Sequence, residues 1–399
     1  MKRILSFSTS FPTNHDPIPG VFVKERVRNV DALPDFETKV IAPVPYFPPI
    51  SKFERWYKFS QIPKKETIDG LEVFRPRYFL VPKIGHYIHA ASIAYASFPL
   101  VKKLQKNFDF DLIDAHFIFP NGVAAEMIAR RLNKPFVVTC RGEDIEKFPA
   151  LPYIGDQIRQ TLKRADALVA LSERIEKAML ANGADPKKIT RIGNGVDCKK
   201  FTPVPKKDAR KTLNLPQDRP VVISVGYRLE LKGFHLLVDT IPKLLKKFPN
   251  LLVVIIGGVA SWGEDYTPVI EERIKANQVE NHVMLAGPRP PKEMHLWYSA
   301  TDLFALLSSR EGSPNVVMEA TACGAPVLAT SVGGIPEIIN DPRLGHLIPE
   351  RTVQDAAEGI EKALSADWDR KYIRNVTETR SWEGTANKVG RIFNNLCSR

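Results

Sequence analysis

Short apolar runs alternate with amphipathic segments along this chain of 399 residues, and that alternation restricts its fold more than any other feature. Strands of a buried parallel sheet form short apolar runs, whereas the helices between them have a period of about 3.6 residues. The runs fall into two series, residues 4–8, 40–42, 112–115, 136–139 and 167–170, then residues 221–225, 252–256, 283–286, 303–307 and 327–329. The order predicts an α/β protein with two doubly wound, Rossmann-like domains.

The two series are separated by residues 201–208, a proline- and charge-rich stretch that we interpret as a linker. We therefore expect an N-terminal domain over residues 1–200 and a C-terminal domain over residues 201–380, facing one another across a cleft. A chain of this length can bury two cores of ordinary size. In doubly wound sheets the ligand lies at the carboxyl ends of the strands, so functional residues are expected there.

Composition indicates a cytoplasmic protein. The chain is 44% hydrophobic and 26% charged, and no apolar run reaches the 18 residues that a membrane span needs. Its start leads into a predicted strand rather than a signal sequence. The four cysteines are far apart, with neither metal-ligand nor disulfide spacing.

The formal net charge of +12 raises the question of an anionic partner. Nucleic acid is not expected, because no nucleic-acid-binding signature is present. Residues 51–59 and 76–83 mix basic and aromatic side chains, which suit a lipid head-group layer. We slightly favour ordinary loop packing for both segments. Peripheral contact with an anionic membrane, at its inner face, is the alternative.

Residues 313–316 predict an anion site at a helix N-terminus. Ser313 is a favoured N-cap residue, and Pro314 then takes the first helical position. The N–H groups of Asn315 and Val316 would face outward with the positive end of the helix dipole. Such a terminus suits a phosphate group.

Two carboxylates flank that site. Glu311 precedes the helix, and Glu319 lies five residues beyond Pro314, roughly 7.5 Å along the axis. Carboxylates accept hydrogen bonds from sugar hydroxyls, so the layout would fit a nucleotide sugar, with a sugar at one end and a ribose at the other. An acidic first turn that only complements the helix dipole is the alternative reading.

The spacing of Glu311 and Glu319, followed by Gly-Gly-Ile-Pro-Glu at residues 333–337, resembles family 4 of the retaining glycosyltransferases, the glycosyl transferases group 1 with the GT-B fold. The resemblance implies that Glu311 holds sugar hydroxyls and is catalytic, and that Glu319 holds the ribose. The donor-binding residues between them would be Gly312, Ser313, Asn315 and Val316.

Residues 224–233 resemble the segment in which this family holds the donor diphosphate with an Arg and a Lys. Lys232 matches the lysine, which would offset charge on the leaving diphosphate. Arg228 stands one residue after the family's arginine position, which Tyr227 occupies. Residues 19–23 resemble the glycine loop that approaches the diphosphate from the first domain, which assigns Gly20 to donor binding.

Three further segments resemble family landmarks. His116, in residues 114–117, matches the histidine near the reacting sugar, so the resemblance implies a catalytic role for it. Asp144 belongs to a Thr-x-His-Gly-x-Asp segment, which the resemblance assigns to the acceptor side. Arg141 replaces the usual histidine of that segment and could receive a phosphate or carboxylate of the acceptor. Residues 380–386 resemble the start of the C-terminal helix, so residues from about 381 to 399 are expected to pack back on the first domain.

The expected function is transfer of a hexosyl group, with retention, from a nucleotide-diphosphate donor to a hydroxyl of a glycan or lipid-linked acceptor in envelope polysaccharide or glycolipid synthesis. Uridine is expected from the family alone. No cofactor is expected. The Asp-x-Asp motifs at residues 109–111 and 367–369 do not follow strands, and Lys232 with the helix dipole would supply the positive field, so we expect metal-independent transfer.

Three other functions compete with this interpretation. An NAD-dependent oxidoreductase is disfavoured, because neither residues 9–20 nor residues 257–263 contain the glycine pattern of a dinucleotide site. A nucleotide-sugar epimerase on the same architecture would bind the donor without an acceptor. A degenerate nucleotide- or lipid-binding scaffold is favoured by Tyr227 and Arg141 but opposed by Lys232, Glu311 and Glu319.

Overall fold

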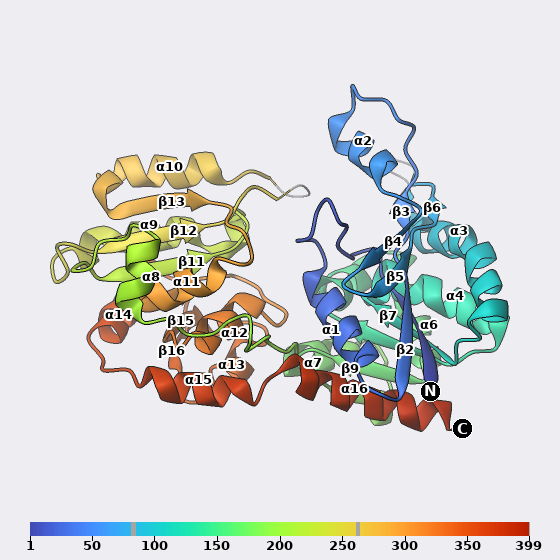
Figure 1. The fold of residues 1–399 in the computed structure, drawn as a ribbon. Helices are drawn as coiled ribbons and strands as arrows, with labels where there is room; N and C mark the ends of the chain where they lie inside the picture. The colour runs from blue at the N-terminus through green and yellow to red at the C-terminus, as the bar shows by residue number, and fades with distance from the viewer. Residues whose placement is uncertain (81–84, 261–263, 399) are drawn as a thin grey trace. The chain divides into compact units, whose positions relative to one another are not determined.

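The computed structural model describes residues 1–80, 85–260 and 264–398, which form two compact units (Figure 1). Unit 1 contains Met1–Asn194 and Trp382–Arg399, and unit 2 contains Gly195–Ser381. The prediction of a linker at residues 201–208 is wrong, because this stretch is packed into unit 2. Phe201 is buried in the core of unit 2, and the Val204 N–H donates a 3.1 Å hydrogen bond to Ser299 Oγ.

Unit 1 is built on an eight-stranded sheet in the order β10-β9-β8-β7-β1-β2-β5-β4. All neighbouring strands are parallel except β4, which is antiparallel to β5. The strands are β1 (Lys2–Phe7), β2 (Phe36–Ile41), β4 (Lys65–Ile68), β5 (Leu71–Phe74), β7 (Leu112–His116), β8 (Phe136–Cys140), β9 (Ala167–Ala170) and β10 (Ile189–Arg191), with a separate pair β3 (Val44–Pro45) and β6 (Arg77–Tyr78). The five strands predicted for this half are confirmed as β1, β2, β7, β8 and β9.

Helices cover both faces of this sheet. The C-terminal helix packs against α1 within unit 1, where Phe393 makes an edge-to-face contact with Phe36 at 6.0 Å between ring centroids. The helices are α1 (Val21–Asp31), α2 (Glu54–Gln61), α3 (Gly85–Asn107), α4 (Val123–Leu132), α5 (Glu143–Glu146), α6 (Ile154–Arg164), α7 (Glu173–Ala181) and α16 (Trp382–Cys397). None of the helices in the described ranges is long and apolar enough to cross a membrane.

Unit 2 is built on a fully parallel six-stranded sheet in the order β13-β12-β11-β14-β15-β16. Its strands are β11 (Val221–Val225), β12 (Leu252–Ile256), β13 (Val283–Gly287), β14 (Leu303–Leu306), β15 (Val327–Thr330) and β16 (Gly345–Ile348). Neighbours along a strand belong to different hydrophobic clusters: Val221 and Ile223 to one, Val222 to the other. Both faces of the sheet are therefore buried, which explains why these strands are continuous apolar runs. The five strands predicted for this half are confirmed.

The helices of unit 2 complete the two cores on either side of the sheet. They are α8 (Lys206–Thr212), α9 (Phe234–Leu244), α10 (Thr267–Ala276), α11 (Met294–Ala300), α12 (Asn315–Ala322), α13 (Ile335–Ile338), α14 (Val353–Leu364) and α15 (Arg370–Glu378).

Each sheet has one switch point, where the strand order reverses. In unit 1 it lies between β1 and β7, and in unit 2 between β11 and β14. The loops that leave two such strands diverge to opposite sides, which leaves room for polar groups at the carboxyl ends. Gly20 and His116 follow or end the switch strands of unit 1, and Lys232 and Glu311 follow those of unit 2.

Candidate active site

Lys232 and Glu311 form an ion pair at the switch point of unit 2. Lys232 ends a 3-10 turn (Glu230–Lys232) after β11, and Glu311 lies in the loop after β14. Lys232 Nζ lies 2.7 Å from Glu311 Oε1, and Ser308 Oγ donates a 2.6 Å hydrogen bond to the same oxygen. The side chains are 17% and 10% exposed, so both groups are partly dehydrated but still reachable from solvent.

The two glycines after β15 hold the Glu311 loop in place. Gly333 has φ +58°, and a Cβ at this residue would lie 1.8 Å from the Glu311 carbonyl oxygen. The Gly334 N–H donates a 2.7 Å hydrogen bond to the Gly312 carbonyl. Gly333 therefore lets the loop after β15 approach the Glu311 loop more closely than a residue with a Cβ could.

The loop that carries Lys232 is also held by close contacts with its neighbours. A Cβ on Gly226 would lie 3.3 Å from the Lys232 side-chain carbons, so the lysine stem runs across this glycine. Gly233, with φ +71°, lies so close to the Leu307 carbonyl that a Cβ would come within 2.2 Å of its oxygen. The Ser309 N–H donates a 2.8 Å bond to the Leu231 carbonyl. The loops after β11 and β14 therefore support one another and fix the ion pair.

The helix after this loop begins one residue later than predicted. Helix α12 starts at Asn315, and Pro314 is its N-cap with ψ 112° and no side-chain cap. The prediction of Ser313 as N-cap and Pro314 as the first helical residue is wrong. Proline fixes φ but leaves ψ free, and the N-cap position needs no intrahelical N–H, so an extended Pro314 is tolerated there. Asn315 and Val316 remain in the first turn, where the dipole is positive.

Glu319 is held by a residue that sequence reasoning missed. Tyr298 lies on α11 with its side chain fully buried, and its hydroxyl donates a 2.8 Å hydrogen bond to Glu319 Oε2. Burial raises the pKa of Glu319, while the Tyr298 hydrogen bond and the charge of Lys200 act in the opposite direction. The available signal was a tyrosine next to Trp297 in a segment expected to pack against the strand at residues 303–307, since a buried tyrosine hydroxyl needs a partner.

Arg228 forms its hydrogen bonds on the side of β11 that faces β12. Its backbone N–H donates a 2.9 Å bond to the Gly258 carbonyl, and its NH1 donates a 3.3 Å bond to Thr267 Oγ1 on α10. These contacts lie toward β12, whereas Lys232 is joined to the loop after β14. Contact between Arg228 and a diphosphate stays a prediction.

His116 is the last residue of β7 in unit 1 and is fully buried. Its Nε2 lies 3.2 Å from Asp114 Oδ2, and its Nδ1 lies 2.9 Å from an Arg141 guanidinium nitrogen. Burial lowers the pKa of His116 to about 4. The charges of Arg141 and Arg26 also lower this pKa, whereas Asp114 raises it. The imidazole is therefore neutral at pH 7 and can exchange hydrogen bonds without carrying a charge.

Arg141 is a buried cation beside this histidine. Its guanidinium lies 4.9 Å from the Phe22 ring centroid and donates a 3.2 Å bond to Asn194 Oδ1. Burial lowers the pKa of Arg141 to about 9, so the group stays charged at pH 7. Whether an acceptor anion contacts it stays a prediction.

Arg26, which sequence reasoning missed, supports the same network from α1. Its NH1 donates a 2.6 Å bond to Thr139 Oγ1, and its NH2 lies 3.3 Å from Asp114 Oδ1. Arg26 shares the buried face of the helix with Val23, Val27 and Val30. A charged residue within an apolar stripe of helical spacing was the sequence signal for this position.

Asp144 and Gly20 have structural contacts of their own. Asp144 Oδ1 accepts bonds from the N–H groups of Arg141 and Gly142 at 3.0 and 2.8 Å, and Oδ2 accepts one from Ile118 at 2.8 Å. Gly20 is the N-cap of α1 with φ +70°, and a Cβ there would lie 2.3 Å from the Ser10 carbonyl oxygen. Both residues hold backbone segments at the carboxyl edge of unit 1.

The acidic residues show no metal-binding arrangement among the residues that the structure describes, where no cluster of three or more His, Cys, Asp or Glu could hold an ion. The Asp-x-Asp carboxylates have other partners. Asp111 accepts a bond from the Arg3 N–H, Asp109 lies near Lys134, and Asp369 caps α15. Metal independence stays a prediction.

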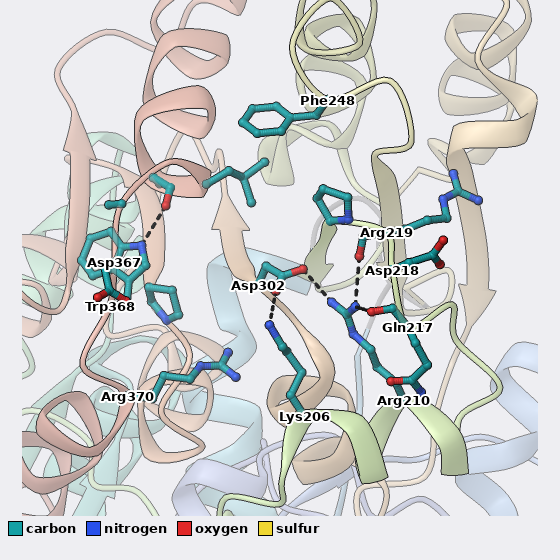
Figure 2. Close-up of a pocket in the computed structure, with 15 residues that line it drawn as sticks. Lys206, Arg210, Gln217, Asp218, Arg219, Phe248, Asp302, Asp367, Trp368 and Arg370 are labelled. Atoms are coloured by element: carbon teal, nitrogen blue, oxygen red, sulfur yellow. Dashed lines mark hydrogen bonds and ion pairs between the residues drawn. The ribbon is translucent and has the colours of Figure 1, made fainter.

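A cavity of about 420 Å³ lies at the opposite, amino edge of the unit 2 sheet (Figure 2). Its cations are already engaged by the protein. Arg210 and Lys206 both pair with Asp302 at 2.6 Å, and Arg370 donates to the carbonyls of Ser299 and Thr301. We therefore interpret the side chains that line this cavity as residues that anchor the ends of helices and strands. The candidate site lies at the carboxyl edge of the sheet.

Comparison with known proteins identifies the family of the chain. Residues 205–380 match the family model of the glycosyl transferases group 1, and residues 37–200 match that of glycosyltransferase family 4. The chain is 29% identical over 364 residues to TuaC of Bacillus subtilis strain 168, a glycosyltransferase whose name assigns it to teichuronic acid biosynthesis. The alignment covers 90% of this chain and 88% of TuaC.

Two solved structures share the fold over nearly the whole length. Sucrose-phosphate synthase of Thermosynechococcus elongatus has a TM-score of 0.80 at 19% identity and full coverage of both chains. HepE of Anabaena, solved in complex with UDP, has a TM-score of 0.74 at 20% identity and covers 99% of this chain and all of its own. The chain therefore belongs to the group 1 glycosyltransferases of the family 4 type, with the GT-B fold, and transfers a sugar from a nucleotide donor.

Proposed function

We propose that the protein is a retaining, metal-independent hexosyltransferase that uses a UDP-sugar donor. The acceptor would be a hydroxyl of a glycan or lipid-linked glycan in envelope polysaccharide or glycolipid synthesis. The observation that carries the proposal is the Lys232–Glu311 pair, 2.7 Å apart at the switch point, with α12 and Glu319 directly after it. The UDP-bound HepE and the teichuronic acid biosynthesis in the name of TuaC support the choice of donor and acceptor.

Each residue has one role in this proposal. Lys232 faces the diphosphate, and its ammonium offsets the charge that develops on the leaving group. Both contacts of Glu311 fall on Oε1, so Oε2 is the atom proposed to accept bonds from sugar hydroxyls. Glu319 accepts bonds from the ribose hydroxyls, with Tyr298 fixing its other oxygen.

In the transfer step the bond between the anomeric carbon and the diphosphate oxygen breaks, and a bond from that carbon to the acceptor oxygen forms on the same face. The acceptor proton passes to an oxygen of the departing diphosphate, so no protein base is required. The positive field of Lys232 and the α12 N-terminus takes the place of a divalent ion.

Thermal unfolding with UDP, GDP, ADP and their sugar forms, with and without magnesium, tests the donor assignment. A nucleotide at a hundred times its dissociation constant adds about 2.7 kcal/mol, a shift of several degrees. A shift with uridine nucleotides that EDTA leaves unchanged is expected. A shift with another base would replace uridine, and one that needs magnesium would refute metal independence.

Product analysis by NMR tests the reaction itself. An α-linked UDP-sugar should give an α-linked product, and a β-linked product would refute retention. Conversion of the donor to its epimer without an acceptor would support the epimerase instead.

A further inference from the structure

Unit 1 carries a contiguous group of exposed aromatic and aliphatic side chains that the transfer reaction does not use. We define the aromatic patch as Tyr46, Phe79, Tyr87, Ile88, Tyr95 and Tyr153, all of which are exposed. Tyr95 and Phe79 reach 80% and 69% exposure. Single exposed apolar residues are ordinary, but a connected group indicates an interaction surface.

Ring contacts and one hydrogen bond connect the patch. Tyr46 and Phe79 have ring centroids 5.2 Å apart, and those of Tyr87 and Tyr153 are 6.3 Å apart. Ser92 Oγ on α3 donates a 2.6 Å bond to the Phe79 carbonyl, and β6 packs against α3 (Figure 1). Ile88 and Tyr95 lie four residues before and three residues after Ser92, on the same helix face. The Phe79 backbone therefore lies beside this face of α3.

The same helix face continues into basic residues. Lys102 and Lys106 are exposed and lie 14 and 18 residues after Ile88, four and five helical turns further on. Lys103 beside them is also exposed. Helix α3 therefore presents an apolar stripe over its first half and a positive one over its last turns.

The surrounding sequence contains no opposing charge. From Glu72 to Asp109 the chain has six Lys or Arg residues and no Asp or Glu between them. Exposed carboxylates border this surface at Asp109, which accepts a bond from Gln105, and at Asp156, which pairs with Arg159. A surface that joins Tyr, Phe and Ile with lysines complements a layer with an anionic face and an apolar interior. A protein partner or a glycan could also pack against the aromatic rings, but neither would explain why residues 73–108 contain no acidic residue.

We propose that the aromatic patch and the lysines at the end of α3 form a docking surface for an anionic lipid bilayer. The rings would enter the head-group layer, and Lys102, Lys103 and Lys106 would face anionic head groups. Docking would bring a lipid-linked acceptor to the enzyme. The docking itself rests on the surface alone, and only its purpose rests on the proposed function.

Co-sedimentation with phosphatidylcholine vesicles, with and without phosphatidylglycerol, tests the proposal. We expect binding to the anionic vesicles that weakens with salt. Phe79→Ser with Tyr95→Ser should weaken it by at least about tenfold, because two buried rings are lost. Lys102→Gln with Lys106→Gln should weaken it by about fivefold per lysine. The matched control is Leu180→Ser, which removes an apolar side chain that is 40% exposed on α7, outside the patch, and should leave binding unchanged.

Three outcomes would overturn the docking surface. The first is that the protein does not bind anionic vesicles, and the second is that all variants bind them equally. The third is that Phe79→Ser with Tyr95→Ser binds vesicles as the wild-type protein does but loses turnover on a water-soluble acceptor. The last would make the patch a glycan-binding surface. The thermal shift with UDP is measured on each variant. An intact shift without vesicle binding refutes docking alone, whereas vesicle binding without any nucleotide shift refutes the proposed function alone.

Discussion

Tyr298→Phe isolates the contact that positions Glu319. The substitution removes one hydroxyl from a fully buried ring and leaves its packing unchanged. The lost bond is 2.8 Å long and ends on a carboxylate. Hydrogen bonds to charged groups contribute about 1.5–3 kcal/mol. We expect a comparable loss in the free energy of unfolding and, because Glu319 is no longer held for the ribose, roughly tenfold weaker UDP binding, equivalent to about 1.4 kcal/mol.

The pH dependence of UDP binding gives the more specific measurement. Burial raises the pKa of Glu319, and the Tyr298 hydrogen bond lowers it. Removing the bond should raise the pKa further. In this proposal the ionised carboxylate binds the ribose. As the pH is lowered, UDP affinity should therefore begin to fall at a higher pH in the variant than in the wild-type protein. Titration calorimetry with UDP across a pH series measures both affinity and midpoint.

Tyr78→Phe is the matched control. Tyr78 is also buried, and its hydroxyl makes a 3.2 Å contact with His89 Nε2 in unit 1. This variant should lose stability but keep both the UDP affinity and its pH midpoint. Unchanged affinity and midpoint in Tyr298→Phe, with stability lowered, would refute the positioning role and leave Tyr298 as a packing residue.

Four other outcomes follow from the same geometry. Glu319→Ala should mainly weaken UDP binding, and an unchanged dissociation constant would refute the ribose assignment. Lys232→Ala should lower kcat by about 10²–10³ with little change in UDP affinity, as for loss of one group that stabilises transition-state charge; a change confined to KM would contradict this role. Gly333→Ala should displace the Glu311 loop, because its Cβ would lie 1.8 Å from a carbonyl oxygen. It should therefore lower activity, whereas Gly258→Ala, with its nearest neighbours at 3.7 Å, is the control. The pKa of His116 is lowered to about 4, so the unfolded chain binds the proton more readily; stability should fall as pH drops from about 6.5 to about 4, by roughly 3 kcal/mol. Burial also lowers the pKa of His89 to about 4, so His89 contributes to the same loss of stability. His116→Gln should therefore reduce, but not abolish, the dependence of the free energy of unfolding on pH in this range, as measured by denaturation.

The central strands were predictable from sequence because they are buried on both faces and read as apolar runs. The edge pair β4 and β5 was missed for the opposite reason. Glu66 and Ile68 are buried while Lys65 and Thr67 are exposed, so the segment alternates and has no apolar run. The Asp69-Gly70 turn, with both residues at positive φ, was the local signal for this hairpin.

Site residues were predictable only one motif at a time. The motifs named Lys232 and Glu311, but nothing in their spacing reveals a 2.7 Å ion pair between residues 79 positions apart. Likewise the sequence marks His116 but reveals neither its burial nor the contact that Arg26 on α1 makes with Asp114, the partner of this histidine. These contacts are set by strand order, and strand order depends on long-range packing rather than on local pattern.

The two units differ in how firmly their charges are held. Arg26 and Asp114 are 2% and 4% exposed, and breaking such a buried pair costs about 3–5 kcal/mol because a charge is left unpaired in a low dielectric. The Lys232–Glu311 pair is more exposed, at 17% and 10%, so breaking it should cost less, in the direction of the ~1 kcal/mol that a surface pair contributes. A diphosphate can therefore compete with Glu311 for the lysine at small cost, whereas nothing that binds at His116 can readily displace Arg26. The fully buried network is suited to hold its shape, and the more exposed Lys232–Glu311 pair to exchange partners during transfer.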